Sequence, residues 1–237
     1  MLEFELYPLK DLMEDFYISE LSKVFEISES KISYNNSQDI TIEGKSYETL
    51  LSERQTSKKI IFRNSENRVL NFLKTFKCKV NEDVQNFLHD KNKCLRFQKK
   101  SKTRTFFIID MRNDVIAAYF SISYKPIILE KDHKISKSKC KKMSKEKNNK
   151  NIDLISTILI GQIGKSDGYS SEDIDLENIL EYVFYIINII KEYIGGRVIL
   201  IEVDNEPKLI KHYEKYGFEK LQTSNDLSQL MQLLEHY

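Results

Sequence analysis

Glycine is unevenly distributed along this chain, and its placement limits the folds that the chain can adopt. Six of the seven glycines lie between residues 161 and 217. Because glycine allows positive φ and close approach of the backbone, we expect tight turns or a ligand site in this region. The first of them fall in an apolar strand predicted over residues 156–164. An amphipathic helix is predicted over residues 176–194, with Asp175 as its N-cap and Gly195 or Gly196 at its C-terminal end.

The other hydrophobic patterns alternate between strand and helix. They predict a hairpin of two strands over 103–110 and 115–125, a buried strand over 197–204, a short helix with Pro207 in its first turn, a strand over 218–222, and either a strand or a helix over 227–234. A further helix beginning at Asn81 is expected to continue to about residue 100. This order predicts an α/β (α+β) protein with a mixed sheet flanked by helices.

Composition and net charge argue against several classes of protein. The chain carries 37 Lys and Arg against 36 Asp and Glu, a net charge of +1, which argues against wholesale wrapping of nucleic acid. An odd count of three cysteines argues against a secreted disulfide framework, and their spacing matches no zinc ribbon, so no metal site is predicted. The acidic N-terminus and the lack of a long apolar stretch favour a cytoplasmic protein without a membrane span.

Positive charge is concentrated in two segments. Residues 91–104 hold seven Lys and Arg and no acid, and residues 130–151 hold nine Lys and almost no apolar side chain. The second segment is expected to be an exposed, lysine-rich loop. Both could be ordinary solvated surface, or they could attract phosphates or an acidic partner.

The strand, glycine-bearing loop and helix over residues 156–194 could form a phosphate site, because the N-terminus of a helix directs N–H groups at the loop. The loop matches neither the Walker A pattern nor the dinucleotide fingerprint. A simple connection between strand and helix is the alternative interpretation.

The stretch GGRVILIEVDNEPKLIKHYEKYGFEKL, with its ending Tyr213-x-x-x-Gly217-Phe218, resembles the C-terminal half of the GCN5-related N-acetyltransferase (GNAT) family. Upstream, FKCKVNEDVQNFLHDKNKCLRFQKKSKTRTFFIID and VIAAYFSISYK resemble the early helix and central hairpin of the branch that contains bacterial toxin acetyltransferases. The resemblance implies a mostly antiparallel, twisted GNAT-like sheet over residues 71–237. Residues 1–70 are left as an N-terminal extension of unknown role.

The resemblance implies acetyl-CoA as co-substrate and direct attack of an amine on the thioester. It assigns Tyr213 as the general acid for the departing thiolate and Glu202, Asp204 or a water molecule as proton acceptor. Without it, Tyr213 is better explained as a core residue on an amphipathic helix, and Glu202 is at least as well explained as a solvent-facing carboxylate. The implied cofactor-binding residues are those of the strand end, the following loop and the next strand end: Gln162, Ile163, Gly164, Lys165, Ser166, Gly168, Ser170, Ser171 and Asn205.

The loop KSDGYSSEDID departs from the family pattern, because it has one glycine and several acids where a pyrophosphate would bind. Asn205 also stands one place earlier than the family asparagine. The leading hypothesis is an acetyl-CoA-dependent N-acetyltransferase whose amine acceptor could be linked to RNA. The alternative is a catalytically silent GNAT-like fold that binds a protein or nucleic-acid partner, and a homodimer is left open.

Overall fold

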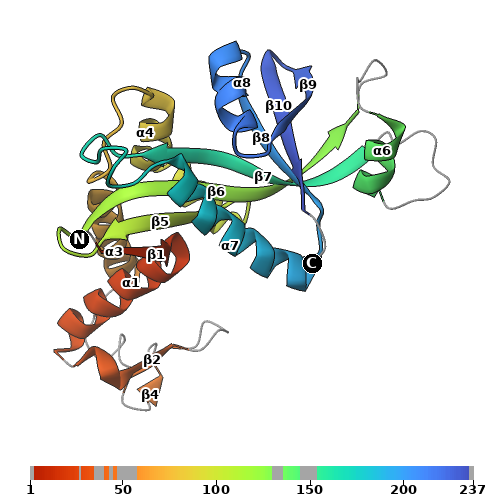
Figure 1. The fold of residues 1–237 in the computed structure, drawn as a ribbon. Helices are drawn as coiled ribbons and strands as arrows, with labels where there is room; N and C mark the ends of the chain where they lie inside the picture. The colour runs from red at the N-terminus through yellow and green to blue at the C-terminus, as the bar shows by residue number, and fades with distance from the viewer. Residues whose placement is uncertain are drawn as a thin grey trace.

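A seven-stranded mixed sheet forms the centre of the protein (Figure 1). The computed structural model describes residues 3–26, 28–34, 40–42, 45–46, 58–129, 136–144 and 154–234. In the strand order β1-β5-β6-β7-β8-β10-β9, all neighbours are antiparallel except β7 and β8. The strands are β1 (Phe4–Pro8), β5 (Arg104–Asp110), β6 (Val115–Ile128), β7 (Leu154–Lys165), β8 (Val198–Asp204), β9 (Glu219–Ser224) and β10 (Leu227–Leu233). The predicted fold class is confirmed, and the segment expected to be either a strand or a helix near the C-terminus forms the strand β10.

Helices cover both faces of this sheet. On one face, α7 (Leu176–Ile194) and α8 (Pro207–Glu214) pack on alternate strand residues such as Ile108, Phe120 and Ile201. On the other face, residues of α1 (Leu9–Phe25), α3 (Lys58–Leu73), α4 (Glu82–His89) and α5 (Cys94–Lys99) surround Phe107 and Tyr119. Successive strand side chains point to opposite faces, so each strand supplies both layers of the core.

Helix α7 has the ends that its sequence predicts. The Asp175 side chain accepts a hydrogen bond from Asn178 N at 2.9 Å, and Asn178 Oδ1 accepts one from Asp175 N at 3.0 Å, which completes a capping box. Gly195 ends the helix with φ of 80°, a conformation that glycine adopts without steric cost. The buried stripe of the helix is Ile179, Leu180, Val183 and Ile187.

The helix expected from Asn81 to about residue 100 is two helices. Asn81 caps α4 as predicted, since its side chain accepts hydrogen bonds from Asp83 N and Val84 N. The chain then turns, and Asp90 Oδ1 accepts a hydrogen bond from Asn92 N at 2.8 Å before α5 begins. This turn directs both short helices onto the same core, where Leu88 and Leu95 are buried.

Strand β1 and the first half of α1 pack with the main sheet, although residues 1–70 were expected to form a separate extension. Strand β1 pairs with β5 from Phe4↔Asp110 to Pro8↔Phe106 and forms the edge of the sheet. Leu9 and Leu12 of α1 are buried against the α4–α5 layer. The extension proper lies between α1 and α3. It includes η1 (Glu29–Lys31) and a small sheet of β2 (Ile32–Tyr34), β3 (Ile40–Ile42) and β4 (Lys45–Ser46), whose isoleucines pack on Leu21 and Ile61.

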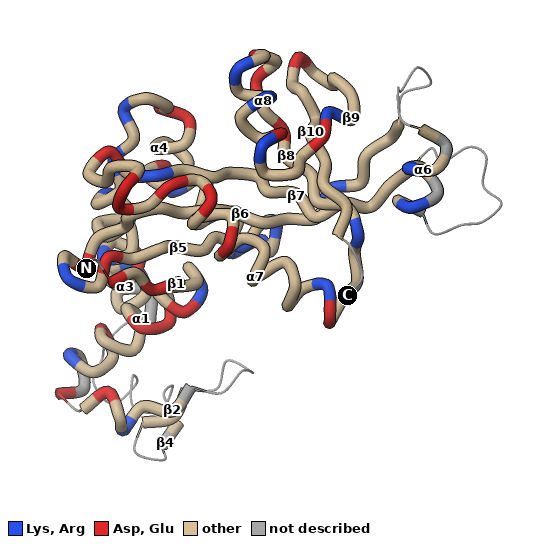
Figure 2. The backbone as a smooth tube through the Cα atoms, in the orientation of Figure 1, with Lys and Arg blue, Asp and Glu red and all other residues tan. Residues whose placement is uncertain are grey.

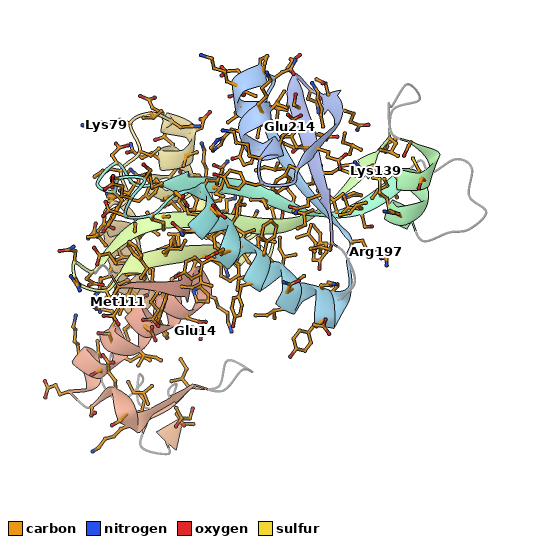
Figure 3. The ribbon with its side chains drawn as sticks, in the orientation of Figure 1. Glu14, Lys79, Met111, Lys139, Arg197 and Glu214 are labelled. Atoms are coloured by element: carbon orange, nitrogen blue, oxygen red, sulfur yellow. The ribbon has the colours of Figure 1, made fainter. Side chains whose placement is uncertain are left out.

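The lysine-rich segment at 130–151 was expected to be an unpacked loop, and this is wrong for its centre. Helix α6 (Lys137–Ser144) forms there and buries Met143 beside Ile127, Val198 and Met231 at one end of the sheet. This apolar contact, the ion pair of Lys139 with Glu219 and a hydrogen bond from Arg197 Nη1 to Lys142 O attach the helix to the sheet. Figure 3 shows Lys139 of α6 at this end of the sheet, far from Lys79 near α4. Residues 130–135 and 145–151 lie outside the described residues.

Candidate active site between strands β7 and β8

Strands β7 and β8 pair for a short distance and then separate. Their parallel register runs from Thr157↔Val198 to Ile160↔Ile201. Beyond it, β7 continues to Lys165 toward α4, whereas β8 continues to Asp204 beside α8 (Figure 1). In the described part of the chain, residues 161–165 have a strand partner only on their β6 side. The sheet therefore contains a gap with an unpaired backbone edge.

A β-bulge lies at the base of this gap. Ser121 of β6 pairs with Gln162 and Ile122 pairs with Ile160, so Gly161 is an additional residue in β7. A Cβ at Gly161 would lie 3.3 Å from Ser121 Oγ. That hydroxyl is buried and has no hydrogen-bond partner in the described structure. An unpaired backbone edge and an unsatisfied hydroxyl fit a ligand that carries amide or carbonyl groups.

Tyr213 of α8 lies on the α7 face of the sheet, near this gap in the core that includes Ile201 and Val203. Only 7% of the residue is exposed, and its ring meets the edge of Phe218 at a centroid distance of 5.9 Å. Burial raises the pKa of Tyr213 to about 12. The phenol is therefore protonated at neutral pH. Its hydroxyl forms no hydrogen bond with any described residue, so its proton is available to a ligand.

Glu202 is the first residue of β8 beyond its pairing with β7, and it points to the face opposite to Tyr213. Lys125 Nζ of β6 donates to both Glu202 carboxylate oxygens, at 2.7 and 2.6 Å. Gln229 Nε2 of β10 donates to Glu202 Oε1 at 2.7 Å, and Gln222 Nε2 donates to Gln229 Oε1 at 2.8 Å. The Glu202 carboxylate is therefore fixed by hydrogen bonds from Lys125 and Gln229 and is not freely solvated.

The first half of the β7–α7 connection is bound to the segment that precedes α4. Ser166 is buried, and its Oγ accepts a hydrogen bond from Lys77 N at 3.2 Å. Asp167 N donates to Lys77 O at 2.7 Å, and Lys79 N donates to Asp167 Oδ2 at 2.9 Å. These contacts position the loop beside the gap and give Ser166 a structural role.

In the second half of the connection, many polar groups form hydrogen bonds with one another. Its acidic residues are drawn red in Figure 2. Asp173 Oδ2 accepts from Ser170 N and Ser170 Oγ, both at 2.8 Å. These hydrogen bonds from the Ser170 side chain and backbone lower the pKa of Asp173, and the Lys165 charge contributes further. Gly168 is exposed, with open space where a Cβ would be.

The residues of β7 predicted to bind the cofactor lie along the gap, whereas the side chain of Asn205, at the end of β8, is bound to neighbouring strands. Gln162, Ile163 and Gly164 lie on the unpaired edge. A Cβ at Gly164 would lie 2.3 Å from Val84 Cγ1, so this glycine also allows α4 to pack on the strand. Asn205 Oδ1 accepts from Ser228 Oγ at 2.7 Å and Lys220 Nζ at 3.1 Å, which ties the end of β8 to β9 and β10.

Three polar residues near the gap were missed by sequence reasoning: Ser121, Lys125 and Gln229. The usable signal was a charged residue inside each of two apolar strands: Lys125 near the end of the second hairpin strand, and Glu202 within VILIEVD. Opposite charges at such positions are expected to pair when the strands come together, because a buried charge without a partner is costly.

None of the described helices has the length and hydrophobicity required to span a membrane. His, Cys, Asp and Glu side chains of the described segments also form no group of three or more able to hold a metal ion.

No protein-family model matches the sequence, and no curated protein matches it either. Solved structures do match. One described as a bacterial toxin has a TM-score of 0.52 and 16% identity, and the match covers 68% of this chain and 82% of that chain. A tyrosine-to-phenylalanine variant of KacT has a TM-score of 0.53 and 16% identity, with 68% of this chain and 86% of that chain covered.

A third similar structure is AtaT complexed with acetyl-methionyl-tRNAfMet. It has a TM-score of 0.51 and 17% identity, and the match covers 67% of this chain and 85% of that chain. AtaT and KacT are acetyltransferase toxins of the GNAT family. The chain therefore has the fold of the GNAT toxins, and the resemblance inferred from the sequence is confirmed at the level of the fold.

Proposed function

We propose that this protein is an acetyl-CoA-dependent N-acetyltransferase. The observation that carries the proposal is the gap between β7 and β8, with its unpaired backbone edge on one side and the hydroxyl of Tyr213, a mostly buried residue, on the other. Acetyl-CoA supplies a reactive acetyl thioester, and its pantetheine arm carries amide groups that can add to a sheet edge.

The cofactor contacts in this proposal come mainly from the backbone. Gln162, Ile163 and Gly164 offer the unpaired edge of β7 to the pantetheine amides. Lys165, Gly168, Ser170 and Ser171 lie where the pyrophosphate would meet the N-terminal end of α7. Ser166 contributes by holding this loop in place, and Asn205 by holding the end of β8.

Tyr213 is proposed as the general acid. Its phenol is protonated at neutral pH and has no competing acceptor, so it can donate its proton to a thiolate that leaves on the α7 face. Glu202 is proposed as the proton acceptor on the opposite face, where the amine would approach. Because burial raises the pKa of Tyr213 to about 12, the phenol should stay protonated, and activity should not fall through its ionisation, until the pH approaches that value.

The acceptor is proposed to be an amine linked to RNA. One structural neighbour, AtaT, was solved with acetyl-methionyl-tRNAfMet. In this chain the basic residues of α6, including Lys139 and Lys142, border the face of the sheet on which Glu202 lies. Phosphates of an RNA would be attracted to such a surface, and that attraction would weaken with salt.

The first experiment is calorimetric titration of acetyl-CoA, followed by measurement of thiol release after addition of aminoacylated tRNA. Tyr213→Phe should bind acetyl-CoA as the parent does but transfer acetyl roughly 10²- to 10⁴-fold more slowly, because only the proton donor is lost. Tyr216→Phe is the matched control, since this neighbouring tyrosine also makes a ring contact with His212 and should keep full activity. Equal rates for Tyr213→Phe and the parent would contradict the assignment.

A catalytically silent, partner-binding fold is the second candidate. It is favoured by the β7–α7 connection, where Asp173 already takes hydrogen bonds from Ser170 and adds negative charge. The same titration separates the two candidates. Failure to bind at millimolar acetyl-CoA would exclude the enzyme and leave the partner-binding function.

A further inference from the structure

The side chain of Lys125 crosses one strand to reach another. Lys125 lies in β6 and Glu202 in β8, and β7 separates the two strands in the sheet. The ammonium nevertheless contacts both carboxylate oxygens, at 2.7 and 2.6 Å. The Lys125 side chain keeps 37% of its surface exposed, whereas Glu202 keeps 17%. This lysine is therefore accessible and is held by a carboxylate that is mostly buried.

The contact lies at the base of the gap. Glu202 directly follows Ile201, the last residue of β8 that pairs with β7. The bulge at Gly161 and the unsatisfied hydroxyl of Ser121 lie at the same level of the neighbouring strands. Glu202 points away from the face that holds Tyr213. A primary ammonium is therefore held against the carboxylate that is proposed as the proton acceptor.

Other lysine ion pairs of the described chain lie elsewhere. Lys99 pairs with Glu66 at 2.5 Å beside the ring of Phe62, in the layer formed by α3 and α5. Lys139 of α6 pairs with Glu219 at the far end of the sheet, as Figure 3 shows for Lys139. Of these lysines, Lys125 is the one placed at the gap.

We propose that Lys125 is a modification site, and that the protein transfers an acetyl group from acetyl-CoA to its own Lys125 Nζ. This inference rests on the proposed function, because the thioester must lie in the gap between β7 and β8. Lys125 is then an internal amine acceptor, and Glu202 positions its nitrogen and receives its proton.

The step balances as an ordinary acyl transfer. The Lys125 ammonium gives one proton to Glu202, and its freed electron pair forms a bond with the acetyl carbonyl carbon. The carbon–sulfur bond breaks, and the thiolate takes a proton from Tyr213. Nitrogen loses a second proton, which restores the phenol through solvent. The products are an acetamide at Lys125, free CoA thiol and one proton released from Glu202 to water.

Acetylation would also change the site. The acetamide carries no charge, so Lys125 could no longer neutralise Glu202, and only the Gln229 amide would still donate to that carboxylate. A mostly buried carboxylate without an ammonium partner attracts another cation. The modified protein would therefore present Glu202 to the ammonium of an external acceptor.

The test is to incubate the purified full chain with acetyl-CoA alone and to record its intact mass before and after, with peptide mapping of acetylated lysines. We expect one dominant acetyl group at Lys125. Lys125→Arg, which keeps the charge, should remove it, and Lys99→Arg should leave it unchanged. Glu202→Gln and Tyr213→Phe should each slow its appearance roughly 100-fold, as expected for loss of a proton acceptor or donor.

Calorimetric binding of acetyl-CoA separates the possible failures. Binding without acetylation of Lys125 would overturn this inference and leave the proposed function standing. Acetylation spread over exposed lysines at a rate that Tyr213→Phe does not change would also overturn it, because that pattern is spontaneous chemistry. Absence of binding would exclude the proposed function and the inference together. If Lys125→Arg fails to fold, mapping of the parent chain alone decides between these outcomes.

Discussion

At the scale of single residues, two glycines in the same region are expected to respond differently to substitution. A Cβ at Gly164 would lie 2.3 Å from Val84 Cγ1, so Gly164→Ala forces α4 away from β7. We expect the free energy of unfolding to fall by about 1–3 kcal/mol in urea denaturation. Gly168→Ala is the control, because no atom lies within 4 Å of its Cβ position, and it should change stability by less than about 0.5 kcal/mol.

A second residue-scale prediction concerns pH. Asp110 is buried, and desolvation raises its pKa, but hydrogen bonds from Asn113 Nδ2, Tyr169 Oη and Arg112 N outweigh burial and hold the pKa below its usual value. A carboxyl with a lowered folded-state pKa stabilises the fold above its unfolded pKa, and this contribution is lost as pH falls through the folded pKa.

Tyr169→Phe should therefore lower stability by about 1.5 kcal/mol at neutral pH, since it removes a donor to a charged group. The difference from the parent should begin to shrink below about pH 4, the unfolded pKa of an aspartate, and should be lost as the pH falls through the lowered folded pKa of Asp110. Thermal melts across pH would measure it. Tyr182→Phe, whose hydroxyl has no described hydrogen bond, is the control, and a pH-independent loss in Tyr169→Phe would contradict the role of Asp110.

At the scale of elements, helix α6 is attached by one buried apolar side chain, by the ion pair of Lys139 with Glu219 and by a hydrogen bond from Arg197 Nη1 to Lys142 O. Met143 is 5% exposed and packs with Ile127, Leu129 and Met231, whereas Lys142 on the same helix is exposed. Met143→Ala should cost about 2–3 kcal/mol of docking energy and should make α6 sensitive to limited proteolysis. Lys142→Ala should leave the cleavage rate unchanged. Resistance of Met143→Ala to cleavage would show that α6 is attached in another way.

At the scale of the whole molecule, the N-terminal residues should be indispensable. Strand β1 covers the edge of β5, and Leu9 and Leu12 fill the core that Leu73 shares. A chain limited to residues 71–237 should therefore aggregate, because it exposes both a strand edge and apolar surface. Addition of a peptide of residues 3–26 should restore solubility in part. A soluble, folded monomer of residues 71–237 would contradict this prediction, and circular dichroism with size-exclusion chromatography would decide.

The sequence alone predicted the elements whose signals are local. The capping box of α7, its glycine end, the cap of α4 at Asn81 and the hairpin of β5 and β6 all follow from residues close together in the chain. The single helix predicted from Asn81 to about residue 100 was wrong, because the break near Asp90 depends on contacts that are distant in the chain. The turn that separates α4 from α5 serves the packing of both helices on a core that distant strands complete, and helical periodicity contains no such information.

The tertiary structure decided the site. The family resemblance alone assigned catalytic and cofactor-binding roles to Tyr213, to the strand end at 162–164 and to the following loop. Lys125 and Glu202, which are 77 residues apart, meet only because β6, β7 and β8 are neighbours in a particular register. Burial of Ser166 against Lys77 likewise depends on where the loop meets α4. Periodicity and capping are short-range properties that a sequence displays directly, whereas strand order and register depend on the packing of the whole chain.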